Sequence, residues 1–229
     1  MQAPPAPRRP LVLPLLRQAY EIWSLEASWF LFYGFFMLAA AFALGQVPLV
    51  GLPLSLALDG PLSAGLVLAT RRVTQGERPG PEDFMGGFHG ARRMLLLAAL
   101  SLLVSGLTVV GLVLLLVPGL IVAALLSVAT PVLLLENRSL RGCLQRSTLL
   151  TRARLWPVAA LALLQATLQA LLSLPLVDSL LHGTEPTLPQ VLPVFLGLGL
   201  LGPFHGILGT LLYFRLREES AGGELVKDL

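Results

Sequence analysis

The stretch from Arg92 to Arg138 decides the fold, and it reads RRMLLLAALSLLVSGLTVVGLVLLLVPGLIVAALLSVATPVLLLENR. No charged side chain lies between the paired arginines and Glu136. Because about 20 apolar residues cross the hydrocarbon core of a bilayer, this run predicts two membrane spans, residues 94–117 and 120–135. Pro118 and Gly119 between them predict a tight turn. Two spans joined by so short a link form an antiparallel hairpin.

The basic residues fall into four clusters that are separated by long stretches without Lys or Arg. The clusters are Arg8, Arg9 and Arg17; Arg71, Arg72, Arg78, Arg92 and Arg93; Arg138, Arg141, Arg146, Arg152 and Arg154; and Arg215, Arg217 and Lys227. Cytoplasmic loops collect Lys and Arg, whereas exported loops avoid them. Each interval between clusters therefore leaves the cytoplasm and returns, which predicts six spans in three hairpins with both termini inside.

The remaining segments follow from the same pattern. The predicted spans are residues 27–45, 48–70, 94–117, 120–135, 155–176 and 191–214. Residues 48–70 contain Pro53, Gly60 and Pro61, so this span is predicted as a broken helix. Residues 13–26 and 139–151 mix apolar and charged side chains, which predicts two cytoplasmic interfacial helices. We expect a disordered N-terminus at 1–12, one membrane domain at 13–217 and a cytoplasmic tail at 218–229.

Composition excludes a soluble domain. The chain is 55% hydrophobic and only 13% charged, with a mean hydropathy of +0.78, whereas about a quarter of the residues in a soluble domain are charged. We therefore expect an all-α, multi-pass protein of the bacterial inner membrane. Its basic residues flank apolar spans, so they predict anionic lipid head groups as partners and not nucleic acid. One cysteine and three scattered histidines give no metal-ligand spacing, and we expect no cofactor.

Asp59 and His205 are candidates for an intramembrane polar site. At about 1.5 Å per residue, Asp59 lies about 18 Å from Arg71, and His205 about 15 Å from Arg215. Ionisable groups at such depth mark a pathway or pair with other polar groups, as a small transporter would require. Asp59 and the following Gly-Pro pair also suit the start of a helix, and this capping role is favoured. For His205, hydrogen bonding between helices is favoured over proton transfer.

An intramembrane serine protease is the remote alternative. Ser105 lies about 18 Å from Arg93 by the same rise, near the level of His205, and a serine and a histidine at matching depth could form a catalytic dyad. The rhomboid serine motif, however, requires a glycine two places before the serine, where this chain has Leu103. The characteristic external loop between the first two spans is also missing. We therefore expect no enzyme activity.

Several short motifs resemble one known group of proteins. They are Pro118-Gly119, Thr130-Pro131, Glu136-Asn137, Arg146-Ser147, Gly60-Pro61 with Gly65, the loop 84–88, and the ending 211–218. Together they resemble a broad bacterial family of uncharacterised six-span proteins, similar to the membrane domain attached to some glycerophosphodiester phosphodiesterases. The usual Asp of the last motif is Phe214 here. The resemblance implies a six-helix membrane module and no phosphodiesterase chemistry, since that activity belongs to a separate barrel domain.

The motif residues predict an interfacial clamp. Glu136 ends the fourth span, where Arg141 or Arg146 on the following helix could neutralise it. Ser147 and Arg152 complete the predicted clamp and its lipid contacts. The leading hypothesis is a non-enzymatic membrane protein whose basic cytoplasmic face contacts anionic lipids, a partner protein or a second copy of the chain. The alternatives are the transporter built on Asp59 and His205 and, remotely, the protease.

Overall fold

The computed structural model describes residues 11–45, 47, 50–114, 116–183 and 187–225, and this part of the chain is helical without a strand. Six segments in it are long and apolar enough to cross a membrane, which confirms the predicted all-α polytopic fold. The pairing into hairpins and the position of both termini in the cytoplasm stay predictions. The predicted disorder at 1–12 falls almost entirely outside the described residues.

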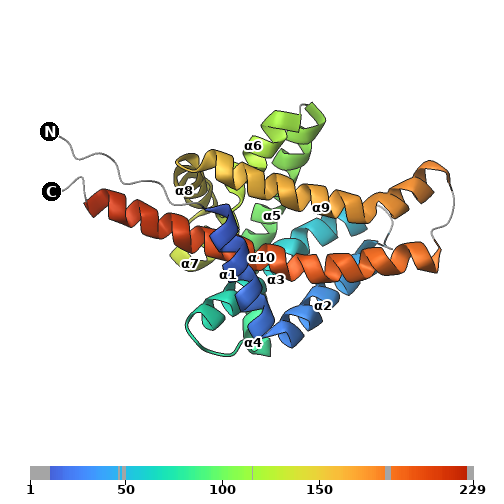
Figure 1. The fold of residues 1–229 in the computed structure, drawn as a ribbon, viewed down its shortest axis with the longest axis horizontal. Helices are drawn as coiled ribbons and strands as arrows, with labels where there is room; N and C mark the ends of the chain where they lie inside the picture. The colour runs from blue at the N-terminus through green and yellow to red at the C-terminus, as the bar shows by residue number, and fades with distance from the viewer. Residues whose placement is uncertain (1–10, 46, 48–49, 115, 184–186, 226–229) are drawn as a thin grey trace.

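The helices in chain order are α1 (Val12–Leu25), α2 (Ala27–Gly45), α3 (Gly51–Thr74), α4 (Pro81–Phe84), the 3-10 helix η1 (Gly86–Phe88), α5 (Ala91–Leu114), α6 (Leu116–Leu126), α7 (Ala129–Glu136), α8 (Leu140–Arg152), α9 (Leu155–Leu181) and α10 (Leu188–Leu225). α10 packs against α9, α2 and α1, while α5 packs against α3 and α6 (Figure 1). The amphipathic α1 and α8 agree within one residue with the two segments predicted as interfacial helices, and their place at the membrane surface stays a prediction. α10 runs eleven residues beyond the predicted sixth span and includes most of the predicted tail.

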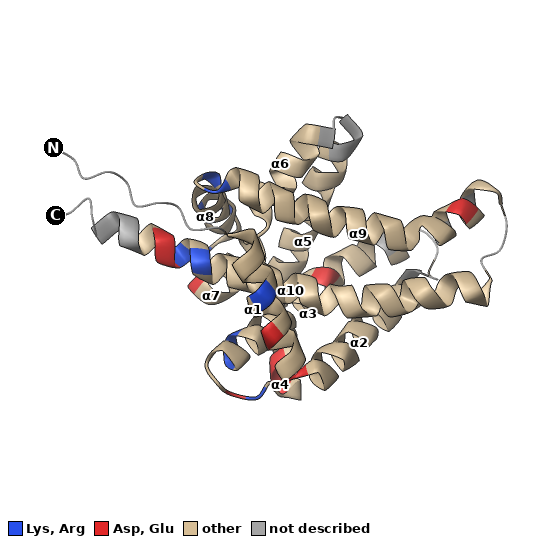
Figure 2. Cartoon of the chain, in the orientation of Figure 1, with Lys and Arg blue, Asp and Glu red and all other residues tan. Residues whose placement is uncertain are grey.

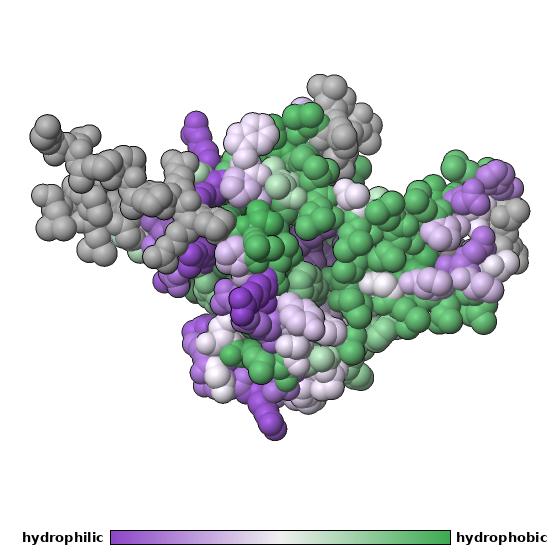
Figure 3. Space-filling model, viewed as in Figure 1, coloured by the Kyte–Doolittle hydropathy of each residue, from purple (hydrophilic) through white to green (hydrophobic). Residues whose placement is uncertain are grey.

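Charge and apolar surface separate along the molecule. The Lys and Arg residues gather at α1, α8, the end of α10 and the loop beside α4, whereas the far end of α9 and α10 has none (Figure 2). Between these ends the visible surface is largely apolar (Figure 3). Large apolar side chains such as Phe42 of α2, Val109 of α5 and Leu171 of α9 are exposed. This distribution suits helices whose outer surface is solvated by lipid.

α3 is continuous where the sequence predicted a break, so the capping role of Asp59 is wrong. The helix runs from Gly51 to Thr74 with Pro61 inside it, and its N-cap position is Val50. A side chain at Gly60 would collide with the carbonyl group of Leu97 on α5. Gly60 therefore serves the close approach of two helices, a common use of small residues in membranes.

Pro118 and Gly119 are not the turn predicted between the third and fourth spans, because they lie in the first turn of α6, where proline is tolerated. The fourth span also has a break that was not predicted: the chain leaves the helical path at Ser127 and Val128, between α6 and α7. Pro131 explains this position: its ring clashes with the carbonyl group four residues earlier, and it has no N–H to donate to that group.

An aromatic cluster fixes the loop after α3. The Phe84 ring stacks on Tyr33 of α2 at a centroid distance of 4.4 Å and meets Phe30 edge to face. The Tyr33 hydroxyl donates to the carbonyl of Leu62 at 2.7 Å and lies 3.1 Å from the carbonyl of Phe84. The loop is thus held against the middle of α3, around Leu62 and Gly65.

Candidate functional site

The break between α6 and α7 receives α8. The Ser147 hydroxyl donates to the carbonyl oxygen of Leu125 at 2.7 Å. The Thr151 hydroxyl lies 3.2 Å from the same oxygen and 2.9 Å from the Ser147 carbonyl of its own helix. Both side chains are fully buried. A carbonyl group released by a helix break must find another donor in an apolar environment, and α8 supplies two. Ser147, predicted as part of a clamp, is therefore a docking residue.

Glu136 forms the predicted clamp with a larger set of partners. Its carboxylate lies 3.7 Å from the Arg146 guanidinium group, as predicted. It also accepts a hydrogen bond from Arg138 at 2.7 Å and one from the Tyr213 hydroxyl of α10 at 3.1 Å. The proposed contact with Arg141 is not formed, because that side chain is exposed on α8. The clamp thus joins α7, α8 and α10.

Two of these partners were missed by sequence reasoning for different reasons. Arg138 follows Asn137, whose backbone is left-handed with φ of 50°, and such a residue reverses the chain at a helix C-terminus. Arg138 can therefore fold back on Glu136 from two residues away. Tyr213 is distant from Glu136 in sequence, and the only sequence feature that pointed to it was its place in the ending 211–218, one of the motifs that carry the family resemblance.

Most of the remaining described acids pair with arginines on the same face. Arg72 contacts Asp83 at 2.9 Å, Glu82 at 3.0 Å and Glu77 at 3.9 Å. The other pairs are Arg17 with Glu21, Arg78 with Glu26, and Arg154 with Glu219. Within the described ranges, seven arginines lack a carboxylate within ion-pair distance: Arg71, Arg92, Arg93, Arg141, Arg152, Arg215 and Arg217. Both Arg141 and Arg152, predicted lipid contacts, are exposed on α8.

Three of the arginines without an acidic partner line one cavity of about 700 Å³. This first basic cavity lies between α1, α3, α7 and α10, and its arginines are Arg71, Arg215 and Arg217. Apolar walls come from Leu135, Leu211 and Phe214, and the polar rim from Gln18, Thr74, Gln75 and Glu218. Three cations and one acid leave the cavity with an excess of positive charge.

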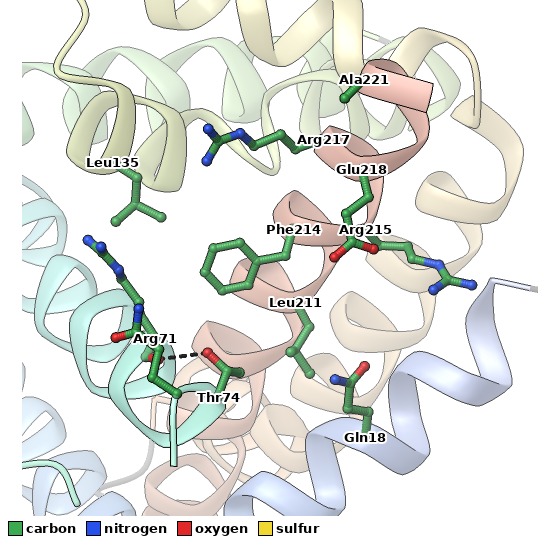
Figure 4. A pocket seen from close by; sticks show the side chains of 11 residues that line it. Gln18, Arg71, Thr74, Leu135, Leu211, Phe214, Arg215, Arg217, Glu218 and Ala221 are labelled. Carbon is green, nitrogen blue, oxygen red and sulfur yellow. Dashed lines mark hydrogen bonds between the residues drawn. The ribbon is translucent and has the colours of Figure 1, made fainter. Parts of the chain in front are cut away.

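Figure 4 shows how these side chains lie. Phe214 extends from α10 toward Arg71 and Leu135, and Arg217 extends from the next turn of α10 on the same side. Arg215 extends from α10 in the other direction. Arg217 also interacts with the Tyr213 hydroxyl, which donates to Glu136. The cavity and the clamp are therefore adjoining parts of one structure.

The two residues of the predicted intramembrane pair interact but line different cavities. Ser101 of α5 donates to the Asp59 carboxylate at 3.3 Å, and Asp59 and His205 interact electrostatically. Asp59, however, lines a cavity of about 180 Å³ between α2, α3 and α10. His205 lines another, of about 160 Å³, between α1, α9 and α10. The two residues thus line different cavities among those described, and the hydrogen bond from α5 to Asp59 comes from Ser101, not Ser105.

Cys143 is fully buried on α8, where its thiol donates to the carbonyl oxygen of Leu140 at 3.0 Å. Burial raises the pKa of this thiol, which keeps it protonated and unreactive at neutral pH. Among the described residues no group of His, Cys, Asp and Glu side chains could hold a metal ion.

Comparison of the chain with protein-family models, curated proteins and solved structures found no match. The resemblance to the six-span bacterial family therefore stays a prediction, and the functional argument depends on the geometry of this molecule.

Proposed function

We propose that this protein is a non-enzymatic, multi-pass protein of the bacterial inner membrane that binds anionic phospholipids through its basic cytoplasmic face. The observation that carries the proposal is the first basic cavity, where Arg71 and Arg217 lie beside an apolar wall and Arg215 adds a third cation to the lining, against one acid, Glu218. Basic pockets between spans on the cytoplasmic side bind phospholipid head groups.

The charges suit a phosphate diester. Arginine binds phosphate through several N–H groups in a fixed planar arrangement, which makes these contacts stronger than neutral hydrogen bonds. Arg71 and Arg217 extend from different helices beside the Phe214 ring (Figure 4). A phosphate group between them would be contacted from two sides.

The apolar and hydrogen-bonding residues of the cavity suit the glycerol, the acyl chains and the head-group hydroxyls of a phospholipid. Leu135, Leu211 and Phe214 offer apolar surface for the glycerol and the upper acyl chains. Gln18 and Glu218 provide hydrogen-bond acceptors, which would pair with hydroxyl groups of the head group. Phosphatidylglycerol has one negative charge and two head-group hydroxyls, so it matches both features. The exposed Arg141 and Arg152 would add contacts to the surrounding anionic surface.

The test compares two double variants by native mass spectrometry of the purified protein with titrated phosphatidylglycerol. R71Q/R217Q removes two cations from the cavity, and we expect the affinity to fall about tenfold or more, because each contact to a charged group contributes roughly 1.5–3 kcal/mol. R17Q/R78Q removes the same charge from exposed arginines outside the cavity, and we expect little change.

Equal affinity of the two double variants would refute the proposal, provided that both retain the wild-type unfolding temperature. Phosphatidylcholine, which carries no net charge, is the lipid control. If R71Q/R217Q binds phosphatidylglycerol normally but no longer copurifies with a protein that the wild type retains, the cavity is a protein-binding site and the lipid proposal fails.

A further inference from the structure

A second basic cavity, of about 710 Å³, lies between α5, α7 and the start of α8. Its cations are Arg92 and Arg93 from α5 and Arg138 from the α7–α8 link. Leu133 and Leu134 of α7 line this cavity, whereas Leu135 lines the first one. The short helix α7 thus separates two basic cavities.

The second cavity differs from the first in its chemistry. No Asp or Glu is among its lining residues, while Glu218 and two glutamines line the first. Arg92 and Arg93 have no ion pair within the described segments. The charge of Arg138 is neutralised by its ion pair with Glu136. The cavity therefore holds close to two uncompensated positive charges.

Its other polar side chains are few. Asn137 and Ser139 lie at its edge, and the Ser139 hydroxyl already accepts the Gly142 N–H as the N-cap of α8. A head group rich in hydroxyl groups would find few acceptors here, because arginine can only donate. The site is suited to an anion that accepts hydrogen bonds and offers none.

We propose that the second cavity binds a phosphomonoester. Such a group carries about 1.5 to 2 negative charges at neutral pH and three strong acceptor oxygens, which matches Arg92 and Arg93 in both charge and hydrogen bonding. A phosphodiester has one charge and leaves one arginine uncompensated. The leucines of α5 and α7 in the same cavity provide a surface for acyl chains, so the group is the head of a lipid such as phosphatidate. None of the residues that carry this proposal lines the first cavity.

The test titrates phosphatidate against protein already saturated with phosphatidylglycerol and counts each bound lipid by native mass spectrometry. In R92Q/R93Q we expect phosphatidate affinity to fall about tenfold or more, with phosphatidylglycerol affinity unchanged. In R71Q/R217Q we expect phosphatidylglycerol affinity to fall and phosphatidate affinity to stay unchanged. Normal phosphatidylglycerol affinity in this variant would contradict the first cavity and the proposed function, but not the second cavity. R17Q/R78Q is again the charge-matched control.

Two results would overturn the assignment: wild-type phosphatidate affinity in R92Q/R93Q, or equal loss of phosphatidate and phosphatidylglycerol in that variant. Addition of glycerol 3-phosphate distinguishes the source of the phosphate. Displacement of phosphatidate at equal concentration would assign the site to a water-soluble phosphomonoester, whereas retention of phosphatidate would assign it to the lipid. Unfolding temperatures of all variants, measured in the same detergent, exclude loss of fold as the cause.

Discussion

The Ser147 hydroxyl of α8 donates a 2.7 Å hydrogen bond to the carbonyl oxygen of Leu125, at the C-terminal end of α6. This bond connects the amphipathic helix α8 to the break between α6 and α7, inside a segment long and apolar enough to cross a membrane. It places α8, and with it Arg146, beside the Glu136 carboxylate.

Ser147→Ala should therefore destabilise the protein by about 1 kcal/mol, the usual contribution of one hydrogen bond, because Thr151 still reaches the same carbonyl at 3.2 Å. The double variant with Thr151→Val should cost more than twice as much, since Leu125 then has neither donor. Thr148→Ala is the control, because that hydroxyl bonds within its own helix. Thermal unfolding in detergent, followed by tryptophan fluorescence, measures all three; equal stability of the double variant and the control would contradict the role of this bond.

Glycine packing provides a second prediction. A side chain at Gly60 would meet the carbonyl of Leu97, and one at Gly65 the carbonyl of Phe84, whereas one at Gly106 would meet nothing within 4 Å. We expect Gly60→Ala and Gly65→Ala to destabilise by about 1–3 kcal/mol through overpacking. Gly106→Ala should be neutral or stabilising by up to about 1 kcal/mol, since alanine favours a helix interior. The same unfolding assay decides the matter, and three equal effects would show that these helix contacts are wrong.

The reactivity of Cys143 should depend on pH in a particular way. Its raised pKa means that the thiolate fraction, and hence the rate of iodoacetamide alkylation, increases only at higher pH than for an ordinary thiol. Burial should lower the rate further. The matched control is Leu149→Cys in a Cys143→Ala background, because Leu149 is 66% exposed on the same helix. Mass spectrometry of alkylated protein at several pH values measures both rates, and equal rates would contradict the burial of α8.

The orientation can be tested with single cysteines in the Cys143→Ala background. A membrane-impermeant maleimide added to intact bacteria without an outer membrane should label a cysteine at Asp178, near the end of α9, and not one at Gln75, after α3. The reason is that arginines surround Gln75 in the chain and are absent around Asp178, and cytoplasmic loops collect such residues. Labelling of Gln75→Cys alone would reverse the assigned orientation.

Sequence patterns predicted the spans well and their breaks poorly. The limits of α2 agree with the predicted span 27–45, because the apolar run ends in both directions at polar or turn-forming residues. Pro61 and Pro118, in contrast, do not interrupt their helices. Near Pro131 the chain does leave the helical path, at Ser127 and Val128. Beside this break, α8 offers hydroxyl groups to the carbonyl of Leu125, a contact between segments more than twenty residues apart that the local pattern does not indicate.

The candidate site, too, could be predicted from sequence only where its residues lie close together in the chain. Glu136 and Arg146 lie ten residues apart on successive helices, so their contact could be predicted from local pattern. The first basic cavity could not, because Arg71 and Arg217 belong to helices that meet only in the folded chain. The arginine clusters were visible in the sequence, but the pairing of some arginines with acids was not. Only the folded structure shows which arginines have no acidic partner and can therefore bind an anionic ligand.

The continuous helix α10 has a mechanical consequence. Its 38 residues extend about 57 Å at 1.5 Å per residue, roughly 27 Å more than the hydrocarbon core of a bilayer. Arg215 and Arg217 lie on this helix, where it lines the first basic cavity. Because one helix is long enough to cross the bilayer and also carries these arginines, any tilt of α10 would move the walls of the first basic cavity as well.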